Sequence, residues 1–251
     1  MGFWEMKAAL EWQLAMGVDE AILDAPVDRT VAAEPSVATE VVPLEVPSEV
    51  DAVAVSRTLA AAAQDLVGLK AAMQSYDHCE LKLGAKQLVF ADGQPKTRVM
   101  IIGEAPGREE DIQGKPFVGR AGQLLDLMFG QIGLSRTATC RGDALYITNV
   151  LPWRPPQNRD PKPDEMAMML PFLERHVDLV NPDILVAMGN HACQALLGRR
   201  GITRLRGTWA KALGKPTLPM FHPAYLLRTT EAKREAWMDL LELNSRLRAL
   251  D

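Results

Sequence analysis

Short apolar runs alternate with longer, helix-like stretches along most of the chain. Four runs are almost wholly apolar and bounded by Gly, Pro or Asn: 98–103, 145–150, 184–189 and 217–221. Runs of this length, separated by helical stretches, are typical of buried strands in a parallel sheet. The helices between such strands cover both faces of the sheet. The pattern predicts an α/β fold, a three-layer αβα sandwich with a central four-stranded parallel sheet.

The first 51 residues follow a different pattern. Apolar residues predict a helix over 3–23, after which the chain is rich in Pro, Val, Ala and Glu. Four prolines exclude a helix interior from this second stretch, and its few aromatic residues leave little surface to bury. Apolar residues return at helical spacing over 52–74. We therefore expect an N-terminal helix (1–24), an acidic linker (25–51) and a folded domain (52–251).

Charge is distributed unevenly between these parts. The formal net charge is −4, but residues 1–51 hold 11 acidic residues against two basic ones, a charge of −9 that leaves +5 for the rest. A mildly basic body suits a partner with a phosphate backbone, although this charge alone favours nucleic acid only weakly. Specific motifs must decide the partner.

Composition also limits where the protein works. No apolar run approaches the roughly 18 residues of a membrane-spanning helix, and the N-terminus lacks the pattern of a signal peptide. Cys79, Cys140 and Cys193 are too few and too widely spaced for a disulfide framework or a CxxC metal site. We therefore expect a cytoplasmic protein with no membrane partner, in which Cys140 and Cys193 are small buried apolar side chains.

Polar or small residues follow every predicted strand. Ligands of open parallel sheets bind outside the carboxyl ends of the strands, so these residues are expected to share one crevice. They are Gly103, Glu104 and Ala105 after the first run, Asn149 at the end of the second, Asn190 and His191 after the third, and His222 after the fourth.

Three residues in or near this crevice, Gly103, Phe117 and Asn149, suit a flat, polar ligand. Gly103 begins the segment GEAPG, where a missing side chain lets the backbone approach a ligand, although a plain tight turn has the same composition. Phe117 lies among glycines and basic residues, where its ring can stack on a base or simply join the core. Asn149 offers the paired donor and acceptor that read a pyrimidine edge, or it is a buried cap.

Two later segments suit contact with DNA. The rigid loop WRPPQNR carries Arg154 and Arg159, which suit phosphate contacts unless the loop is merely solvated. In FHPAYLLR a histidine and a stiff turn precede two leucines and an arginine, a pattern that fits a wedge into a duplex better than a core. A structural role for this segment is the alternative.

The order of these motifs resembles family 4 uracil-DNA glycosylases. The resemblance runs from about residue 79 to 247 through GEAPG with the following Glu110 and Asp111, GKPFVGRAGQLL, TNVLPWRPPQNRDP and FHPAYLLR. It implies the three-layer sandwich, in which Phe117 stacks on uracil and Asn149 binds the polar edge of the base. It also implies that His222 binds the carbonyl oxygen on which negative charge develops, and that Leu226 enters the minor groove.

The resemblance implies a monofunctional DNA glycosylase of base excision repair, which flips deoxyuridine out of DNA and hydrolyses its N-glycosidic bond to leave an abasic site. Another branch of the superfamily has Asp where this chain has Ala105, so Glu104 and Glu110 are the candidate carboxylates beside His222; a solvated surface position is the alternative for Glu110. The expected uracil pocket comprises Gly103, Ala105, Phe117, Asn149 and His222. The expected DNA contacts are Arg120, Arg154, Arg159, Leu226, Leu227 and Arg228.

Two other functions remain open at this point. A non-catalytic protein of the same superfamily would bind uracil-containing or abasic DNA without turnover. A small-molecule hydrolase or nucleotide-binding protein on a doubly wound sheet is the second, but the chain has neither a P-loop nor a GxGxxG motif.

Family 4 enzymes commonly hold a four-iron cluster with four cysteines, and this chain departs from that pattern. The corresponding positions are Tyr76, Cys79, Trp153 and Met169, of which only one is a cysteine. One thiolate does not hold such a cluster, so we predict no cofactor and no metal. We expect the three replacing side chains to pack together in its place.

The remaining expectations concern partners. Uracil-containing DNA is the expected substrate, bound by a monomer that associates with the nucleoid of a bacterial-type cell. The N-terminal helix, with Trp4 and Trp12, either docks on the body or binds a protein partner.

Overall fold

The structure, a computed structural model, describes residues 2–18 and 51–250, which belong to two compact units, Met1–Glu49 and Val50–Asp251. The described part of the first unit is the helix α1 (Phe3–Ala15), none of whose side chains is buried. The helix expected over 3–23 thus ends at Ala15, in a turn that places Gly17 at a φ of 85°. Residues 19–23 and the expected linker up to residue 50 lie outside the described residues.

The second unit alternates helices and strands. Its strands are β1 (Asp92–Gly93), β2 (Val99–Gly103), β3 (Leu145–Asn149), β4 (Ile184–Met188), β5 (Ala210–Ala212) and β6 (Lys215–Met220). Its helices are α2 (Ala52–Ala62), α3 (Leu66–Ser75), α4 (Leu81–Gly84), α5 (Arg108–Gln113), α6 (Arg120–Gly130), α7 (Pro163–Val180), α8 (Gly189–Leu197), α9 (Ile202–Leu205), α10 (Pro223–Arg228) and α11 (Lys233–Arg248), with short 3₁₀ turns at Pro156–Asn158 and Thr230–Ala232. Across the described residues, no helix has both the length and the apolar character that crossing a membrane requires.

The strands form one mixed sheet with the order β1-β3-β2-β4-β6-β5. The four central strands are parallel, as the apolar runs predict, but β1 and β5 add an antiparallel strand at each edge. The expected four-stranded sheet is therefore corrected to six strands. Sequence patterning missed the edge strands because they are only two and three residues long and hold no apolar run.

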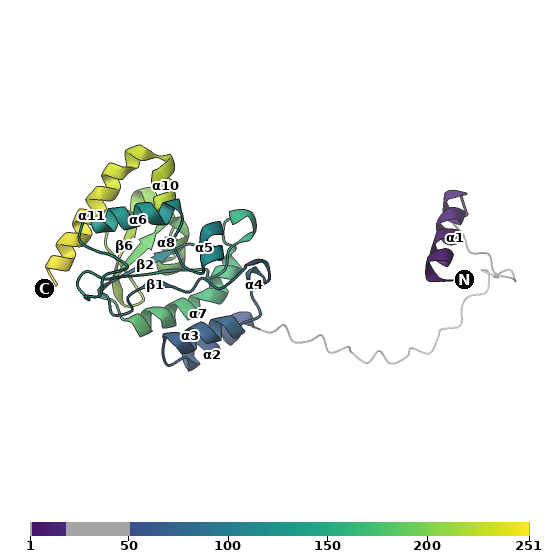
Figure 1. Ribbon diagram of the computed structural model, residues 1–251, viewed down its shortest axis with the longest axis horizontal. Helices are drawn as coiled ribbons and strands as arrows, with labels where there is room; N and C mark the ends of the chain where they lie inside the picture. Colours follow the sequence, from purple (N-terminus) through teal and green to yellow (C-terminus); the bar gives the residue numbers. More distant parts are fainter. Residues whose placement is uncertain (1, 19–50, 251) are drawn as a thin grey trace, which may run out of the picture. The chain divides into compact units, whose positions relative to one another are not determined.

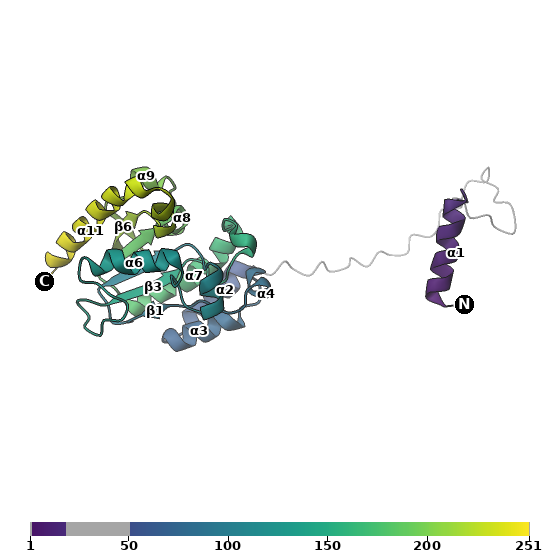
Figure 2. The ribbon, with the colours of Figure 1, turned by 45° about the horizontal axis from the view of Figure 1, so that its top comes forward.

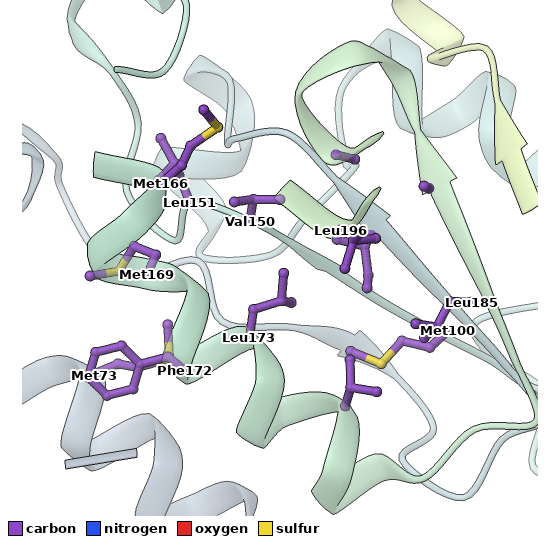
Figure 3. Close-up of a cluster of buried hydrophobic side chains, with 14 of the residues drawn as sticks. Met73, Met100, Val150, Leu151, Met166, Met169, Phe172, Leu173, Leu185 and Leu196 are labelled. Carbon is purple, nitrogen blue, oxygen red and sulfur yellow. The ribbon is translucent and has the colours of Figure 1, made fainter. Parts of the chain in front are cut away.

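Helices cover both faces of this sheet, which confirms the three-layer α/β fold (Figure 1). Alternate residues of β2 face opposite layers, as the two-residue period of a strand requires. Val99 and Ile101 join the core under α6 and α11, which lie side by side over the sheet in Figure 2. Met100 and Ile102 belong to the other core, which α7 and α8 cover. Figure 3 shows part of this second core, with Met100 on the sheet and Leu173 on α7.

The helix expected over 52–74 is broken into α2 and α3. The break follows from two polar interactions at the junction. The Asp65 carboxylate accepts the backbone N–H of Gly68 at 2.7 Å and so starts a new helix. The guanidinium of Arg175, on α7, donates to the carbonyl oxygen of Ala63 at 2.8 and 3.0 Å. A tertiary contact therefore satisfies a carbonyl that a continuous helix would have bonded internally.

Candidate active site

The carboxyl ends of the parallel strands open into a pocket of about 610 Å³. It is lined by the segments that follow β2, β3, β4 and β6, so the four motifs expected to converge do so. The predicted site residues that line it are Glu104, Ala105, Glu110, Phe117, Asn149, Arg159, His222 and Arg228. Gly103 lies directly beside this lining, whereas Arg120, Arg154, Leu226 and Leu227 are not part of it.

Phe117 and Gly103 fit against each other at the base of the pocket. A Cβ atom at Gly103 would overlap both the Phe117 ring and Asn149 Oδ1, so only glycine leaves room for both side chains. The Phe117 ring lies 5.3 Å from the His222 ring between centroids, at an angle of 30°. Two predicted ligand-binding side chains are thus neighbours, although 105 positions separate them in the sequence.

The Phe117 backbone is held in an unusual conformation. Its φ is 53°, in the left-handed region that non-glycine residues rarely adopt. Arg136 donates hydrogen bonds to the carbonyl oxygens of Pro116 and Phe117, both at 2.9 Å. Gly122 leaves the space that the Phe117 carbonyl occupies. The surrounding structure therefore fixes the ring that faces the pocket.

Both carboxylate oxygens of Glu110 accept backbone hydrogen bonds. Oε1 accepts the N–H groups of Val118 and Gly119 at 2.9 Å, and Oε2 accepts that of Gly107 at 3.1 Å. Glu110 thus ties the turn after β2 to the Phe117 loop. Its position in the structure is that of a scaffold for the pocket wall rather than of a free carboxylate or a solvated surface residue.

Asn149 presents an acceptor without a partner. The residue is buried, and its Oδ1 atom has no hydrogen-bond partner among the described residues. Leaving a buried acceptor unpaired costs about 1–3 kcal/mol, so this atom, beside a pocket, is a candidate acceptor for a ligand donor. Asn149 lines the same pocket as Phe117.

Burial favours the neutral form of the His222 imidazole, and a backbone hydrogen bond selects its tautomer. Burial lowers its pKa, an effect that the nearby charge of Glu104 opposes. Its Nδ1 atom accepts the backbone N–H of Ala224 at 3.1 Å. A neutral ring whose Nδ1 accepts carries its proton on Nε2. The pocket is therefore lined by an uncharged side chain that donates a hydrogen bond.

Glu104 and His191 form an ion pair in the pocket wall. His191 Nδ1 lies 2.6 Å from Glu104 Oε2, and its Nε2 lies 3.8 Å from Asp160 Oδ2. In the described part of the chain these three residues are the group whose ligand atoms all lie within 4.8 Å of one another, as a metal site requires. Two of the three, Glu104 and His191, already pair directly with each other.

The structure separates the two leucines expected to act as a wedge. Leu226 is 0% exposed and packs in a small core with Phe221 and Ala236, whereas Leu227 is 38% exposed. The burial contradicts the assignment of Leu226 to the wedge, because a side chain with no exposed surface cannot enter DNA without leaving its core. Leu226 and Leu227 are successive residues of α10, so their side chains point about 100° apart and only one of them faces the core, which the letters LL do not reveal.

The expected phosphate contacts also differ from one another. Arg120 and Arg228 are exposed. Arg154 donates to Asn158 Oδ1 at 2.7 Å, and the Arg159 guanidinium forms a two-point ion pair with Glu165. The pair with Glu165 raises the pKa of Arg159. Arg159 therefore reaches the pocket with part of its hydrogen-bonding capacity already used.

The four positions that correspond to cluster ligands are all buried in one core. The Tyr76 hydroxyl donates to the carbonyl oxygen of Ala52 at 2.8 Å, and burial, with the neighbouring Cys79 and Asp51, raises its pKa to about 12. Burial likewise raises the pKa of the Cys79 thiol. One protonated thiol beside Trp153 and Met169 does not fit the donor set of a four-iron cluster. Of the other cysteines, Cys193 is buried as expected, but Cys140 is exposed, which corrects that prediction.

An apolar ring, an unpaired amide oxygen and an imidazole lie together at the carboxyl end of a parallel sheet. This α/β protein thus has a pocket that suits a flat polar ligand such as a nucleobase. A model of the Uracil DNA glycosylase superfamily matches residues 90–241. The chain belongs to this superfamily.

Three relatives carry the comparison further. The Type-4 uracil-DNA glycosylase of Thermotoga maritima is 40% identical over 172 residues, covering 66% of this chain and 86% of the relative. That of Sulfurisphaera tokodaii is 38% identical over 169 residues, covering 63% and 74%. That of Archaeoglobus fulgidus is 35% identical over 176 residues, covering 66% and 84%. The chain is thus similar to the type-4 branch.

Sequence reasoning assigned no role to three residues that shape the site. His191 and Asp160 line the pocket, and Arg136 holds its Phe117 loop. The position of His191 directly after a predicted strand was the available signal. Asp160 lies within the motif TNVLPWRPPQNRDP, but only the arginines of that motif suggested a role, and Arg136 lies outside every motif.

Proposed function

We propose that the chain is a uracil-DNA glycosylase that hydrolyses the N-glycosidic bond of deoxyuridine in DNA, releasing uracil and leaving an abasic site. The superfamily match and the type-4 relatives support this function. The reaction needs a pocket that recognises a flipped base and groups that stabilise the opposite charges of the transition state.

The unpaired Oδ1 atom of Asn149 is the observation that carries the proposal. Uracil has an N3–H group that donates to such an acceptor, and its O4 oxygen accepts from the Asn149 amide. Cytosine presents an unprotonated N3 and an amino donor at these places, so the hydrogen bonds would be mismatched. A buried mismatch of this kind gives strong discrimination between the two bases.

Phe117 supplies the stacking surface for the base. Its ring borders the pocket, and its backbone is fixed by Arg136 and Gly122. Stacking of a base on an aromatic ring contributes about 1–3 kcal/mol, which offsets part of the cost of extracting the nucleotide.

His222 stabilises the leaving uracil. Bond cleavage places negative charge on a uracil carbonyl oxygen, and the neutral Nε2–H group donates to that oxygen. A donor already oriented in a water-poor site lowers the barrier by about 3–4 kcal/mol in comparable enzymes.

Glu104 is the carboxylate that acts on the sugar side of the reaction. The oxocarbenium-like sugar is stabilised by a negative charge and is attacked by an oriented water. Glu110 lines the pocket, but both its oxygens are bonded to backbone N–H groups, whereas one oxygen of Glu104 bonds to His191. This difference favours Glu104 for the chemistry and Glu110 for holding the loop.

Exposed residues around the pocket bind the DNA. Leu227 takes the place of the base in the stack, in the role first assigned to Leu226. Arg120, Arg154 and Arg228 contact phosphates, and Arg159 contributes while it remains paired with Glu165.

The enzyme works without an iron–sulfur cluster. The observation that supports this is the buried, protonated and apolar character of the four positions that would have to bind one. Iron analysis and the visible spectrum of freshly purified protein test it. An iron content near one cluster per chain would show the proposal to be wrong.

The N-terminal helix binds a protein partner. Its exposed apolar residues include Phe3, Trp4, Leu10, Trp12 and Leu14. An exposed apolar surface of this size is typical of a site that binds a protein partner. The glycosylase itself works as a monomer in the cytoplasm, associated with DNA. Light scattering of the chain alone and with DNA tests whether the chain is a monomer in both states.

Alkali-dependent cleavage of a labelled oligonucleotide with one uracil tests the function. The wild type is compared with Phe117→Ala, Asn149→Ala and His222→Ala, and with His78→Ala, an exposed histidine outside the pocket, as control. Cleavage at uracil that the three pocket variants lose and the control keeps is the expected result. Tight uracil-dependent binding without cleavage would instead identify a non-catalytic reader of damage.

A further inference from the structure

His191 lies where it can control a single carboxylate of the pocket. It is the third residue of α8 and is only 7% exposed. Its Nδ1 atom lies 2.6 Å from Glu104 Oε2, a distance typical of a charge-assisted hydrogen bond. No other hydrogen bond to the Glu104 carboxylate is present in residues 2–18 and 51–250, so the orientation of this side chain depends on His191.

The helix that carries His191 is itself anchored to the active site. Its first residue, Gly189, has a φ of 88°, and a Cβ atom there would lie 3.1 Å from the Cβ of His222. The start of α8 therefore packs against the segment that holds His222. Glu104 and His222 thus share a neighbour whose position the sheet determines, because α8 directly follows β4.

We propose that His191 is a positioning residue for Glu104, holding one carboxylate oxygen so that the carboxylate keeps a fixed orientation toward the sugar and the attacking water. The inference rests on the proposed glycosylase function and on Glu104 as its carboxylate. A glutamate has several rotatable bonds, and a partner that fixes them removes orientations that do not react.

The charges around His191 favour its imidazolium form, which strengthens this hydrogen bond. Three groups face its ring from different segments: Glu104 after β2, Asp160 before α7, and Arg200 after α8. The hydrogen bond and charge of Glu104 raise the pKa of His191, burial and Arg200 oppose this, and Asp160 adds to it, with a net rise. The imidazolium form is thus present below the raised pKa and is lost as the pH increases through it.

This arrangement predicts a specific pH dependence. A neutral His191 can still donate from Nδ1, but the bond then lacks the attraction between opposite charges. The rate of uracil excision should therefore decline gradually, rather than stop, as the pH rises through the pKa of His191. A side chain that donates without titrating should remove this decline.

Two variants of the full chain separate the positioning role from a merely structural one. His191→Ala removes the donor, whereas His191→Asn places an amide N–H close to the Nδ1 position and does not titrate. Single-turnover excision is measured from pH 6 to pH 9 with EDTA present, together with the Kd for an oligonucleotide carrying a non-cleavable 2′-fluorodeoxyuridine. We expect His191→Ala to slow excision about 10- to 100-fold with little change in Kd, and His191→Asn to restore most of the rate with a flat alkaline profile.

A second measurement tests the pair without relying on activity. The chain has four histidines, so the imidazole signals can be assigned by NMR and titrated in the wild type and in Glu104→Gln. The His191 midpoint should fall to lower pH in the variant. An unchanged midpoint, or a His191→Ala variant as active as an active wild type, would overturn the positioning role alone. A wild type that excises no uracil would overturn the proposed function, and this role with it.

Discussion

Arg136 donates a hydrogen bond from its Nη2 atom to the carbonyl oxygen of Phe117 at 2.9 Å, while Phe117 holds a φ of 53°. A second bond from Nη1 reaches the carbonyl oxygen of Pro116, also at 2.9 Å. Asp92 and Asp126 pair with the same guanidinium and fix it in place. The ring that we propose stacks on the base thus depends on an arginine from the segment between α6 and β3.

Replacing Arg136 with alanine should therefore impair excision by releasing the Phe117 loop. We expect a decrease of about 10- to 100-fold in the single-turnover rate, because small displacements of a stacking group disturb the reactive geometry. Arg136→Lys keeps the charge but not the contact with two carbonyl oxygens, so its single-turnover rate should lie between those of the wild type and Arg136→Ala. Arg141→Ala, which removes an exposed partner of Asp183, is the matched control. Full activity in Arg136→Ala would show that the Phe117 loop keeps its conformation without Arg136.

The acidic side of the pH profile should reflect a neutral His222. Burial lowers its pKa, so the midpoint of its protonation lies below 6.5, the ordinary histidine value. The active form is therefore present above the lowered pKa and is lost only below it. Single-turnover rates from pH 5 to pH 7.5 should show no loss centred at 6.5. A loss centred there, absent in His222→Gln, would mean that the imidazole titrates as if exposed.

The two leucines after His222 should differ in what their removal changes. Leu226→Ala deletes a fully buried side chain and should destabilise the fold by about 2–5 kcal/mol. Leu227→Ala should leave the free energy of unfolding within about 0.5 kcal/mol, as exposed positions usually do, but should weaken excision from duplex DNA. Urea unfolding measures the free energy of unfolding of each variant. Excision assays on single- and double-stranded uracil substrates measure the effect on duplex DNA. The reverse pattern would restore Leu226 as the wedge.

Acid should weaken the link between the pocket loop and α7. Burial favours the protonated form of Glu165, but hydrogen bonds from Arg159 and Lys162 outweigh it, so the pKa of Glu165 is lowered. A lowered carboxyl pKa contributes stability above the unfolded value of 4.5, and that contribution disappears as the pH falls through the folded pKa. Glu165→Gln should be less stable than the wild type at pH 7 by on the order of 1 kcal/mol. The difference should shrink in unfolding curves below pH 4.5; a constant difference would mean that the charge is irrelevant.

The apolar runs by themselves determine the central architecture. Strands such as 145–150 and 184–189 agree with β3 and β4 to within a residue, because a buried parallel strand must be apolar on both faces. The convergence of Glu104, Asn149 and His222 follows from the same rule, since ligands bind where parallel strands end. Local composition also marks Phe117 and Gly103 as unusual, and the fold brings them into contact.

Tertiary structure decided which side chains are free to act. The sequence leaves both Glu104 and Glu110 as candidate carboxylates, yet in the structure one pairs with His191 and the other bonds three backbone N–H groups. Likewise, Leu226 and Leu227 are identical neighbours in the sequence, and only the packing of α10 buries one and exposes the other. Sequence patterns fix what each short segment prefers because those preferences are local. The partner of a charge and the burial of a side chain depend on segments far apart in the chain, so only the folded structure determines them.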